Sequence, residues 1–289
     1  MSYETASRLL IDPDATAEQL YGAAVELRGS FERAEHTIGL LPGDADQVMI
    51  RAYRAAADRG LVRAMLDLGA LYVSGEVAPW APYPGKDLAQ GIALLRRADD
   101  AGSAAGALGW IRAAYFARDE SMAPAAVERL SALYSADPED AGVQLLLGYF
   151  ISQGYGYAQD VAAALPFFDA AAARGDADAA FELSILRPES AADWTRRAAD
   201  LGSARAQANL GGMYATGRGV EQDARKAVEW YSRAGDNGHA RAAFIAGVML
   251  LRGDDGLTPD RDAAEGQFAT AEELGFDVDG SLDDMGITR

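Results

Sequence analysis

One pattern recurs along this chain and limits the folds that it can adopt. The segment from Gly202 to Gly238 holds two runs of helical periodicity, separated by a glycine-rich turn. An earlier stretch keeps the same internal spacing, so that Gly148, Gly154, Gly156, Asp160, Ala164 and Gly175 match Gly211, Gly217, Gly219, Asp223, Ala227 and Gly238. A two-helix unit repeated at fixed spacing predicts an all-α repeat protein.

Other parts of the chain carry a further full copy and three altered ones. A third full copy runs from Gly238 to Gly275. The copy from Gly175 to Gly202 is shortened, and a proline link replaces its glycine turn. The copy from Gly60 to Gly102 is lengthened by an insertion from Ala78 to Gly85, and the copy from Gly102 to about Asp140 is degenerate. The pattern therefore predicts stacked hairpins over most of the chain.

The residue types of the best copy predict how such a hairpin holds together. Small residues let neighbouring helices approach closely, and large ones fill the space between them. We expect the first role for Ala206, Gly211 and Ala234, and the second for Leu210, Tyr214, Trp230 and Tyr231. Gly217 and Gly219 are expected to end the first helix with a positive φ, and Asp223 to cap the second helix.

The ends of the chain are expected to close the stack. The run from Asp44 to Gly60 has the pattern of a second helix, whose first helix would lie between Thr16 and His36. We therefore predict an N-terminal helical cap over residues 1–44, repeats over residues 45–275, and a tail or cap over residues 276–289.

At the level of individual residues the units resemble the Sel1-like repeat family, which is related to the tetratricopeptide repeats. The shared pattern is Ala, Leu-Gly, Tyr, Gly-x-Gly-Val, Asp, Ala, Trp-Tyr, Ala, Gly, and residues 202–238 match it almost fully. The resemblance implies a right-handed α/α solenoid of helix-turn-helix repeats. It also implies a non-catalytic adaptor that assembles complexes, bridges regulators or neutralises a partner by wrapping it.

Charge narrows the choice of partner. The chain has 44 acidic and 26 basic side chains, for a net charge of −18, so nucleic acid and anionic membrane would be repelled. A basic protein partner is compatible with this charge, and the alternative is that the acidity serves only to keep the protein in solution. The chain has no cysteine, no leader pattern and no long apolar stretch, which favours a cytoplasmic protein without disulfides. Arginine greatly outnumbers lysine, which fits a bacterial origin.

Partner-binding positions are predicted on the first helix of each unit. In a stack of this kind the first helices line the concave face, and side chains that do not pack between helices point into the groove. The candidates are Arg63, Leu66, Val73, Tyr149, Ser152, Gln153, Asp178, Phe181, Ile185, Arg205, Thr216, Arg241, Phe244, Val248, Leu251 and Arg252. Aromatic and arginine side chains supply much of the binding energy in protein interfaces. The alternative is that the apolar members are core residues and the arginines pair with neighbouring acids.

The insertion offers a second candidate surface. Trp80 and Tyr83 lie within it, and long loops on repeat proteins often carry binding residues. The same loop could instead fold down on the repeats, and the sequence leaves both interpretations open.

Catalysis and cofactor binding are not expected. The two histidines, His36 and His239, have no third group at a spacing typical of a metal site or a nucleophile triad. Gly-Arg-Gly at 217–219 follows no strand and precedes no Gly-Lys-Ser/Thr, so it does not indicate a phosphate loop. The segment DVDGSLDD from Asp277 lacks the terminal Glu of a calcium loop. We therefore predict no enzyme, no metal and no cofactor.

Two functions remain. The first is a scaffold that holds a peptide or helix of its partner in the concave groove. The second is an immunity-type inhibitor that covers a basic toxin or enzyme, for which the charge of −18 would speed association.

Overall fold

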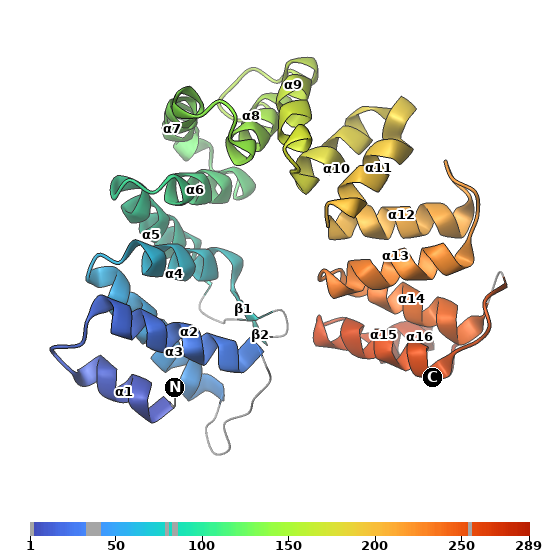
Figure 1. The fold of residues 1–289 in the computed structure, drawn as a ribbon, viewed down its shortest axis with the longest axis horizontal. Helices are drawn as coiled ribbons and strands as arrows, with labels where there is room; N and C mark the ends of the chain where they lie inside the picture. The colour runs from blue at the N-terminus through green and yellow to red at the C-terminus, as the bar shows by residue number, and fades with distance from the viewer. Residues whose placement is uncertain (1–2, 33–41, 79–80, 83–85, 254–255) are drawn as a thin grey trace. The chain divides into compact units, whose positions relative to one another are not determined.

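The computed structural model shows the all-α repeat fold that the sequence predicts, and it describes residues 3–32, 42–78, 81–82, 86–253 and 256–289. The chain forms two compact units, residues 1–135 and 136–289, whose helices appear in Figure 1. The first unit contains α1 (Tyr3–Ile11), α2 (Ala17–Glu32), α3 (Pro42–Asp58), α4 (Val62–Ser74), β1 (Glu76–Ala78), β2 (Ala81–Pro82), α5 (Leu88–Asp100), α6 (Ala104–Phe116), η1 (Glu120–Met122) and α7 (Ala123–Ala136). The second contains α8 (Ala141–Gln153), α9 (Val161–Ala173), α10 (Ala177–Leu186), η2 (Pro188–Ser190), α11 (Ala191–Asp200), α12 (Ala204–Thr216), α13 (Ala224–Asp236), α14 (Ala240–Arg252), α15 (Arg261–Glu273) and α16 (Val278–Asp284).

Glycines and aspartates set the ends of the helices in each hairpin. The first helices α4, α8, α12 and α14 end at glycines with φ between 68° and 75°, a left-handed conformation that L side chains rarely adopt. The second helices begin at an aspartate whose carboxylate accepts a hydrogen bond from the backbone three residues later, as Asp223 does from Lys226 N at 3.1 Å. These observations confirm the predicted roles of Gly217 and Asp223.

Backbone hydrogen bonds between the two helix ends fix the turn of each full hairpin. The backbone N–H of Asp223 donates to the carbonyl of Tyr214 in the last turn of α12 at 2.9 Å. The equivalent bond runs from Asp160 to Ile151 in the preceding full repeat, also at 2.9 Å. The capping aspartate thus holds the start of one helix and the end of another, which fixes the turn geometry.

The glycine of each Leu-Gly pair receives a large side chain from the second helix. A Cβ added at Gly148 would lie 2.7 Å from the ring of Phe168, and one at Gly211 would lie 2.9 Å from the ring of Tyr231. Carbon atoms in van der Waals contact lie about 3.5–4.0 Å apart, so no larger residue fits without a shift. The predicted close approach at Gly211 is confirmed, and Ala206 and Ala234 are fully buried beside it.

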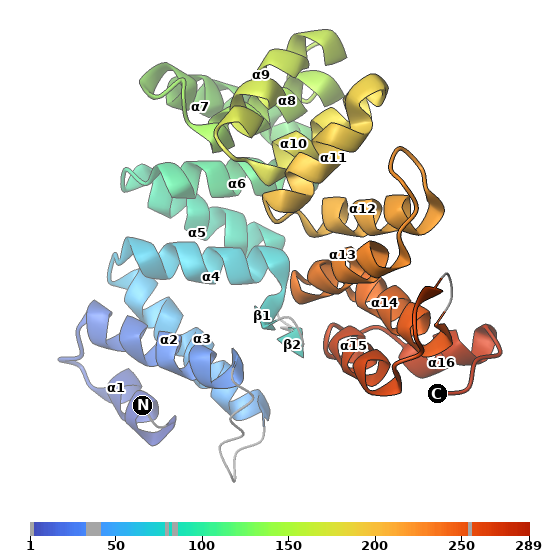
Figure 2. The same ribbon diagram turned by 45° about the vertical axis from the view of Figure 1, so that its right-hand side comes forward.

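Consecutive hairpins stack in each unit, as Figure 2 shows for α12 to α15. Buried apolar residues between the helices form the interior of the unit. In the second unit α12, α13, α14 and α15 contact one another in sequence order. In the first unit the N-terminal helix α1 buries Ala6 in the same core as Met49, Tyr53 and Leu68. As predicted, residues between Thr16 and His36 supply a first helix, α2, for the second helix α3.

The shortened repeat replaces its glycine turn with a single turn of 3-10 helix. Pro188 begins η2, which leads directly into α11. Arg187 at the end of α10 makes a bidentate pair with Asp169 of α9, with N–O distances of 2.7 and 2.6 Å. Its guanidinium also lies 5.9 Å from the ring centroid of Trp194. A charge-assisted pair therefore fixes this link where the glycines are missing.

The degenerate repeat is held by a buried carboxylate. Asp99 of α5 accepts hydrogen bonds from Trp110 Nε1 of α6 at 2.9 Å and from Arg129 of α7 at 2.6 Å. Its side chain is 11% exposed, so the arginine compensates a charge that is largely out of water. After α6 the chain turns through Arg118 with φ 55°, the single non-glycine residue with positive φ among the described residues.

The insertion in the lengthened repeat forms a short antiparallel pair. Strand β1 pairs with β2, Ala78 lying opposite Ala81, and β1 also lies against α2 and α4. Trp80 and Tyr83 lie outside the described residues, so the predicted loop surface stays a prediction.

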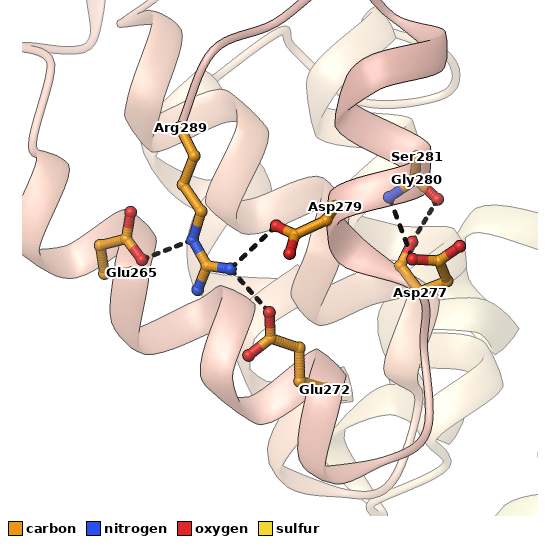
Figure 3. Close-up of polar contacts among 7 residues, drawn as sticks. All are labelled: Glu265, Glu272, Asp277, Asp279, Gly280, Ser281 and Arg289. Atoms are coloured by element: carbon orange, nitrogen blue, oxygen red, sulfur yellow. Dashed lines mark hydrogen bonds and ion pairs between the residues drawn. The ribbon is translucent and has the colours of Figure 1, made fainter.

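The C-terminal segment ends in a charged cluster, shown in Figure 3. Helix α16 buries Val278 and Leu282 against the core of the last repeat. Arg289 donates to Glu265 and Glu272 of α15, each at 2.7 Å, and to Asp279 of α16 at 3.2 Å. Asp277 caps α16 by accepting from Gly280 N at 3.0 Å. The segment with a resemblance to a calcium loop is therefore helical. The Asp277 carboxylate caps its helix, and the Asp279 carboxylate pairs with Arg289.

Candidate protein-interaction surface

In the first unit, α2 and α4 are neighbouring first helices joined by polar contacts. The Tyr21 hydroxyl donates to Asp67 at 2.9 Å, and Arg63 pairs with Glu18 at 2.7 Å. The Arg63 guanidinium also lies 5.2 Å from the Tyr21 ring centroid. The side chains of Arg63 and Glu18 are 59% and 60% exposed, so this pair stays accessible to a partner.

The second unit repeats this arrangement on α8, α10 and α12. The Tyr149 hydroxyl donates to Glu182 at 3.2 Å, and Arg205 pairs with Asp178 at 3.4 Å. The Arg205 guanidinium lies 4.5 Å from the ring centroid of Phe181. We call Tyr149, Asp178, Glu182 and Arg205 the polar strip. It crosses three consecutive first helices and presents both charges and an aromatic ring.

Burial gives the polar strip unusual acid–base properties. Burial raises the pKa of the Glu182 carboxyl, although the hydrogen bond from Tyr149 and the charge of Arg205 oppose that rise. Burial also raises the pKa of the Tyr149 hydroxyl, and the nearby carboxylates of Glu182 and Asp178 add to the effect. A carboxylate that is poorly solvated gains from a cationic or hydrogen-bonding partner group, which suits a contact surface.

Three of the predicted anchors belong to the core. Phe181, Phe244 and Val248 are each 7% exposed. Phe244 packs at centroid distances of 6.0 Å from Phe268 and 4.9 Å from Phe276. This corrects the expected aromatic groove, because the Phe244 ring packs on the second helix of its own hairpin and on the segment that follows it. The Phe181 ring is covered by the guanidinium of Arg205, which lies 4.5 Å from its centroid.

The other predicted positions remain at the surface. Arg63, Gln153, Asp178, Arg205, Thr216, Arg241 and Arg252 are exposed, and Tyr149, Leu66, Val73 and Leu251 are partly buried. Ile185 is 56% exposed, although it is a large apolar residue, whereas Ser152 is buried and donates to the Tyr149 carbonyl at 3.2 Å. The positions that reach the surface are thus mainly polar or charged.

In two repeats an acid precedes the Leu of the first helix, and its role was not predicted from the sequence. Asp67 and Glu182 hold this position in α4 and α10, and both accept a hydrogen bond from a tyrosine of the preceding first helix. In α12 the same position is Asn209. Comparison of the residue before each Leu across the repeats would have identified it.

A hollow of about 560 Å³ lies between α12 and α14, the first helices of consecutive full repeats. Its polar lining consists of Thr195, Asn209, Arg218, Tyr231, His239 and Arg241. We call it the α12–α14 hollow. None of the described residues that line it is acidic, in contrast to the carboxylates of the polar strip.

His239 has a structural role at the edge of this hollow. Its Nδ1 accepts a hydrogen bond from the backbone N–H of Ala242 at 3.2 Å, so the imidazole caps α14. Within the described residues no group of three or more His, Asp or Glu side chains is arranged to hold a metal ion. His36 falls outside those residues.

The repeats match a known family model. The Sel1 repeat model aligns with residues 62–103, 142–176, 180–203, 204–239 and 240–266, which together make up more than half of the chain. The chain belongs to the Sel1 repeat family. The match includes the lengthened and shortened copies, and its boundaries coincide with hairpins α4–α5, α8–α9, α10–α11 and α12–α13. A Sel1 repeat scaffold of this kind is suited to protein–protein interaction.

Solved structures of similar proteins are distant. A Sel1 repeat protein from Oxalobacter formigenes is 24% identical over 92% of each chain, with a TM-score of 0.43. The protective antigen c5321 of uropathogenic Escherichia coli is 21% identical over 93% of this chain and 58% of its own, with a TM-score of 0.48. The immunity protein PA5088 of Pseudomonas aeruginosa is 21% identical over 96% of this chain and 90% of its own, with a TM-score of 0.41. No curated protein matches the sequence.

The helices of the described residues are all too short or too polar to cross a bilayer.

Proposed function

We propose that this Sel1 repeat protein is a non-catalytic scaffold that binds a peptide or helix of a partner protein along its first helices. The observation that carries the proposal is the polar strip, in which Tyr149, Glu182 and Arg205 meet across three consecutive first helices. Accessible arginine and tyrosine side chains are the types enriched in interfaces. Arg63 with Tyr21 supplies the same combination in the first unit.

The accessible apolar residue beside the strip gives the proposal a direct test. Ile185 on α10 is 56% exposed, and Val161 on the second helix α9 is 41% exposed. A photo-crosslinking amino acid would be placed at either position in cells of the source organism, and the captured protein identified by mass spectrometry. We expect one protein to be captured at Ile185 and not at Val161.

The captured protein would then be purified and its affinity measured by calorimetry. Arg205→Ala should weaken binding at least tenfold, in keeping with the roughly 2 kcal/mol of an interface hot spot. Equal capture at both positions, or binding that is unchanged by Arg205→Ala, would exclude the proposed surface.

A second candidate function is supported by the net charge of −18. An immunity-type inhibitor that covers a basic toxin or enzyme would associate quickly through electrostatic steering. Its association rate should fall steeply between about 20 mM and 500 mM salt, because screening shortens the range of the charge. A scaffold that binds a peptide through the polar strip should retain most of its association rate over the same range of salt concentration.

A further inference from the structure

We propose that the α12–α14 hollow binds a carboxylate group carried by an extended segment of the partner. The carboxylate comes from an acidic side chain of that segment, so the inference rests on the proposed function and names the chemistry of its ligand.

The charges of the hollow are all of one sign. Arg218 and Arg241 line it, and neither forms an ion pair with any described residue. The arginines of the first-helix surfaces behave differently, since Arg63 and Arg205 are neutralised by Glu18 and Asp178. A guanidinium group binds a carboxylate through two parallel hydrogen bonds. Two unpaired guanidinium groups at one hollow, in a chain with 44 acidic residues, favour an anionic ligand.

The hydroxyl groups of two largely buried residues complete the hollow. Tyr231 is 9% exposed and Thr195 is 5% exposed, and both line the hollow. Neither hydroxyl has a hydrogen-bond partner among the described residues. Because both residues line the hollow, their hydroxyls can donate hydrogen bonds to a ligand oxygen there. Burial raises the pKa of Tyr231 while the charges of Arg218 and Arg241 lower it, which agrees with both arginines lying near its hydroxyl.

His239 and Asn209 add donors at the rim. Because His239 Nδ1 accepts from the Ala242 backbone, the proton of the neutral imidazole resides on Nε2, which is then free to donate. Asn209 stands where α4 and α10 carry Asp67 and Glu182. At this position α12 therefore carries a neutral amide, where α4 and α10 carry a carboxylate.

Space for the ligand comes from Gly212. The corresponding residue of the preceding full repeat is Tyr149, whose side chain crosses to Glu182 and fills the gap between the first helices. A Cβ at Gly212 would already lie 3.2 Å from the Tyr231 hydroxyl oxygen. The resulting volume of about 560 Å³ lies in the range of small-ligand pockets and exceeds the needs of a single carboxylate.

The hollow is also continuous with the proposed interaction surface. Arg205 of the polar strip and Asn209 of the hollow are one turn apart on α12, so they lie on the same side of the helix. Two neighbouring hollows differ in chemistry: one of about 400 Å³ contains Asp176 and Asp178, and one of about 340 Å³ contains Glu221 and Asp223. A partner segment crossing α10, α12 and α14 would therefore meet its carboxylate site only at the α12–α14 hollow among these three.

The test uses the full-length protein and a pair of short peptides. Acetyl-Ala-Ala-Asp-Ala-amide and its Asn counterpart would be titrated while the backbone amide signals of Gly212 and Ala242 are followed by NMR. We expect the Asp peptide to shift both signals and the Asn peptide to leave them in place. Arg218→Gln and Arg241→Gln should each weaken binding of the Asp peptide about tenfold, the effect of losing one charge-assisted hydrogen bond.

Two variants complete the experiment. Tyr231→Phe keeps the ring that packs on Gly211, as Phe168 does on Gly148, and should weaken binding severalfold without loss of stability. Arg225→Gln removes an exposed arginine of α13 that does not line the hollow, and should bind like the unaltered protein. Equal binding by Arg218→Gln, Arg241→Gln and Arg225→Gln would overturn the carboxylate site.

The source of the carboxylate is tested separately with sodium acetate. Binding of acetate as tight as that of the Asp peptide would overturn the assignment to a partner segment. If the Asp peptide binds as expected but no protein is captured at Ile185, the scaffold function fails while the carboxylate site stands. If a protein is captured at Ile185 but the Asp peptide does not bind, the carboxylate site fails while the scaffold function stands.

Discussion

The repeats at 142–176 and 204–239 share one framework and differ at two positions that face each other. Both place a glycine, Gly148 or Gly211, under a ring of the second helix. In the first repeat the next residue is Tyr149 and the ring belongs to Phe168, with the two rings edge to face at 5.6 Å. In the second the next residue is Gly212 and the ring belongs to Tyr231. One repeat therefore fills the gap between first helices, and the other leaves a hollow lined by an unpartnered hydroxyl.

Exchanging the rings at positions 168 and 231 should give the largest difference in stability between the two repeats. Phe168 is fully buried, so Phe168→Tyr would force a hydroxyl against Tyr149 without a partner and destabilise the protein by about 1–3 kcal/mol. Tyr231→Phe should change stability by less than about 0.5 kcal/mol, because its hydroxyl has no partner to lose. Chemical denaturation of the two variants measures both values. Equal effects would mean that the gaps do not differ in packing.

The shared glycines should give the next largest effect. Gly148→Ala and Gly211→Ala place a methyl group within 3.0 Å of a ring, and such overpacking costs about 1–3 kcal/mol. Replacing glycine by alanine also stabilises the helix by about 1 kcal/mol, so the net destabilisation of each variant should be up to about 2 kcal/mol. Gly266→Ala is the control, because no atom lies within 4 Å of its added Cβ and it should stabilise α15. Stabilisation by all three would refute the close approach.

The degenerate repeat extends the comparison to a turn that has lost its glycine. Arg118, one residue after the C-cap Ala117 of α6, adopts φ 55°, whereas the full repeats use glycine for the left-handed residue that follows the first helix. A left-handed conformation costs an L residue about 1 kcal/mol or more, partly offset by the greater freedom of unfolded glycine. Arg118→Gly should therefore raise the free energy of unfolding by about 0.5 kcal/mol. A lower melting temperature would show that the contact of Arg118 with the Tyr115 ring outweighs the strain.

Substitution of Glu182, which precedes the Leu of α10, should give the smallest effect, and this effect should depend on pH. Burial raises the folded-state pKa of Glu182 above the usual 4.5, so the folded protein loses stability as pH rises from about 4.5 through that higher value. Glu182→Gln cannot lose this proton. It should melt slightly higher than the unaltered protein at pH 7 and at the same temperature near pH 4.

Glu273→Gln serves as the control for Glu182→Gln, because Glu273 is exposed at the end of α15. Its melting temperature should follow that of the unaltered protein across the same pH range. An identical pH dependence for Glu182→Gln would show that the carboxyl at 182 is solvated in the folded state.

Much of the fold followed from spacing alone. The glycines at Gly154 and Gly217, the capping aspartates and the small residues at the crossings impose local conformations that any packing must respect, so the sequence predicted the hairpins and their turns. Membership of the Sel1 repeat family was likewise predictable from residues 202–238. The partition into units at residues 135 and 136 carries no comparable local signal.

The candidate site was less predictable, because it depends on which way side chains turn. Position counting selected Phe181 and Phe244 as groove residues, yet apolar rings gain more by packing between helices than by facing water, and the structure buries them. Tyr231 was predicted from its residue type to fill the space between helices. Nothing in the sequence indicated that Gly212 leaves the Tyr231 hydroxyl without a partner.

The sequence by itself determined the two-helix repeat, the helix ends and the family, since each rests on backbone conformations that glycine and aspartate impose locally. Only the tertiary structure decided which arginines are paired and where a gap remains, because those properties depend on distances between side chains from different repeats.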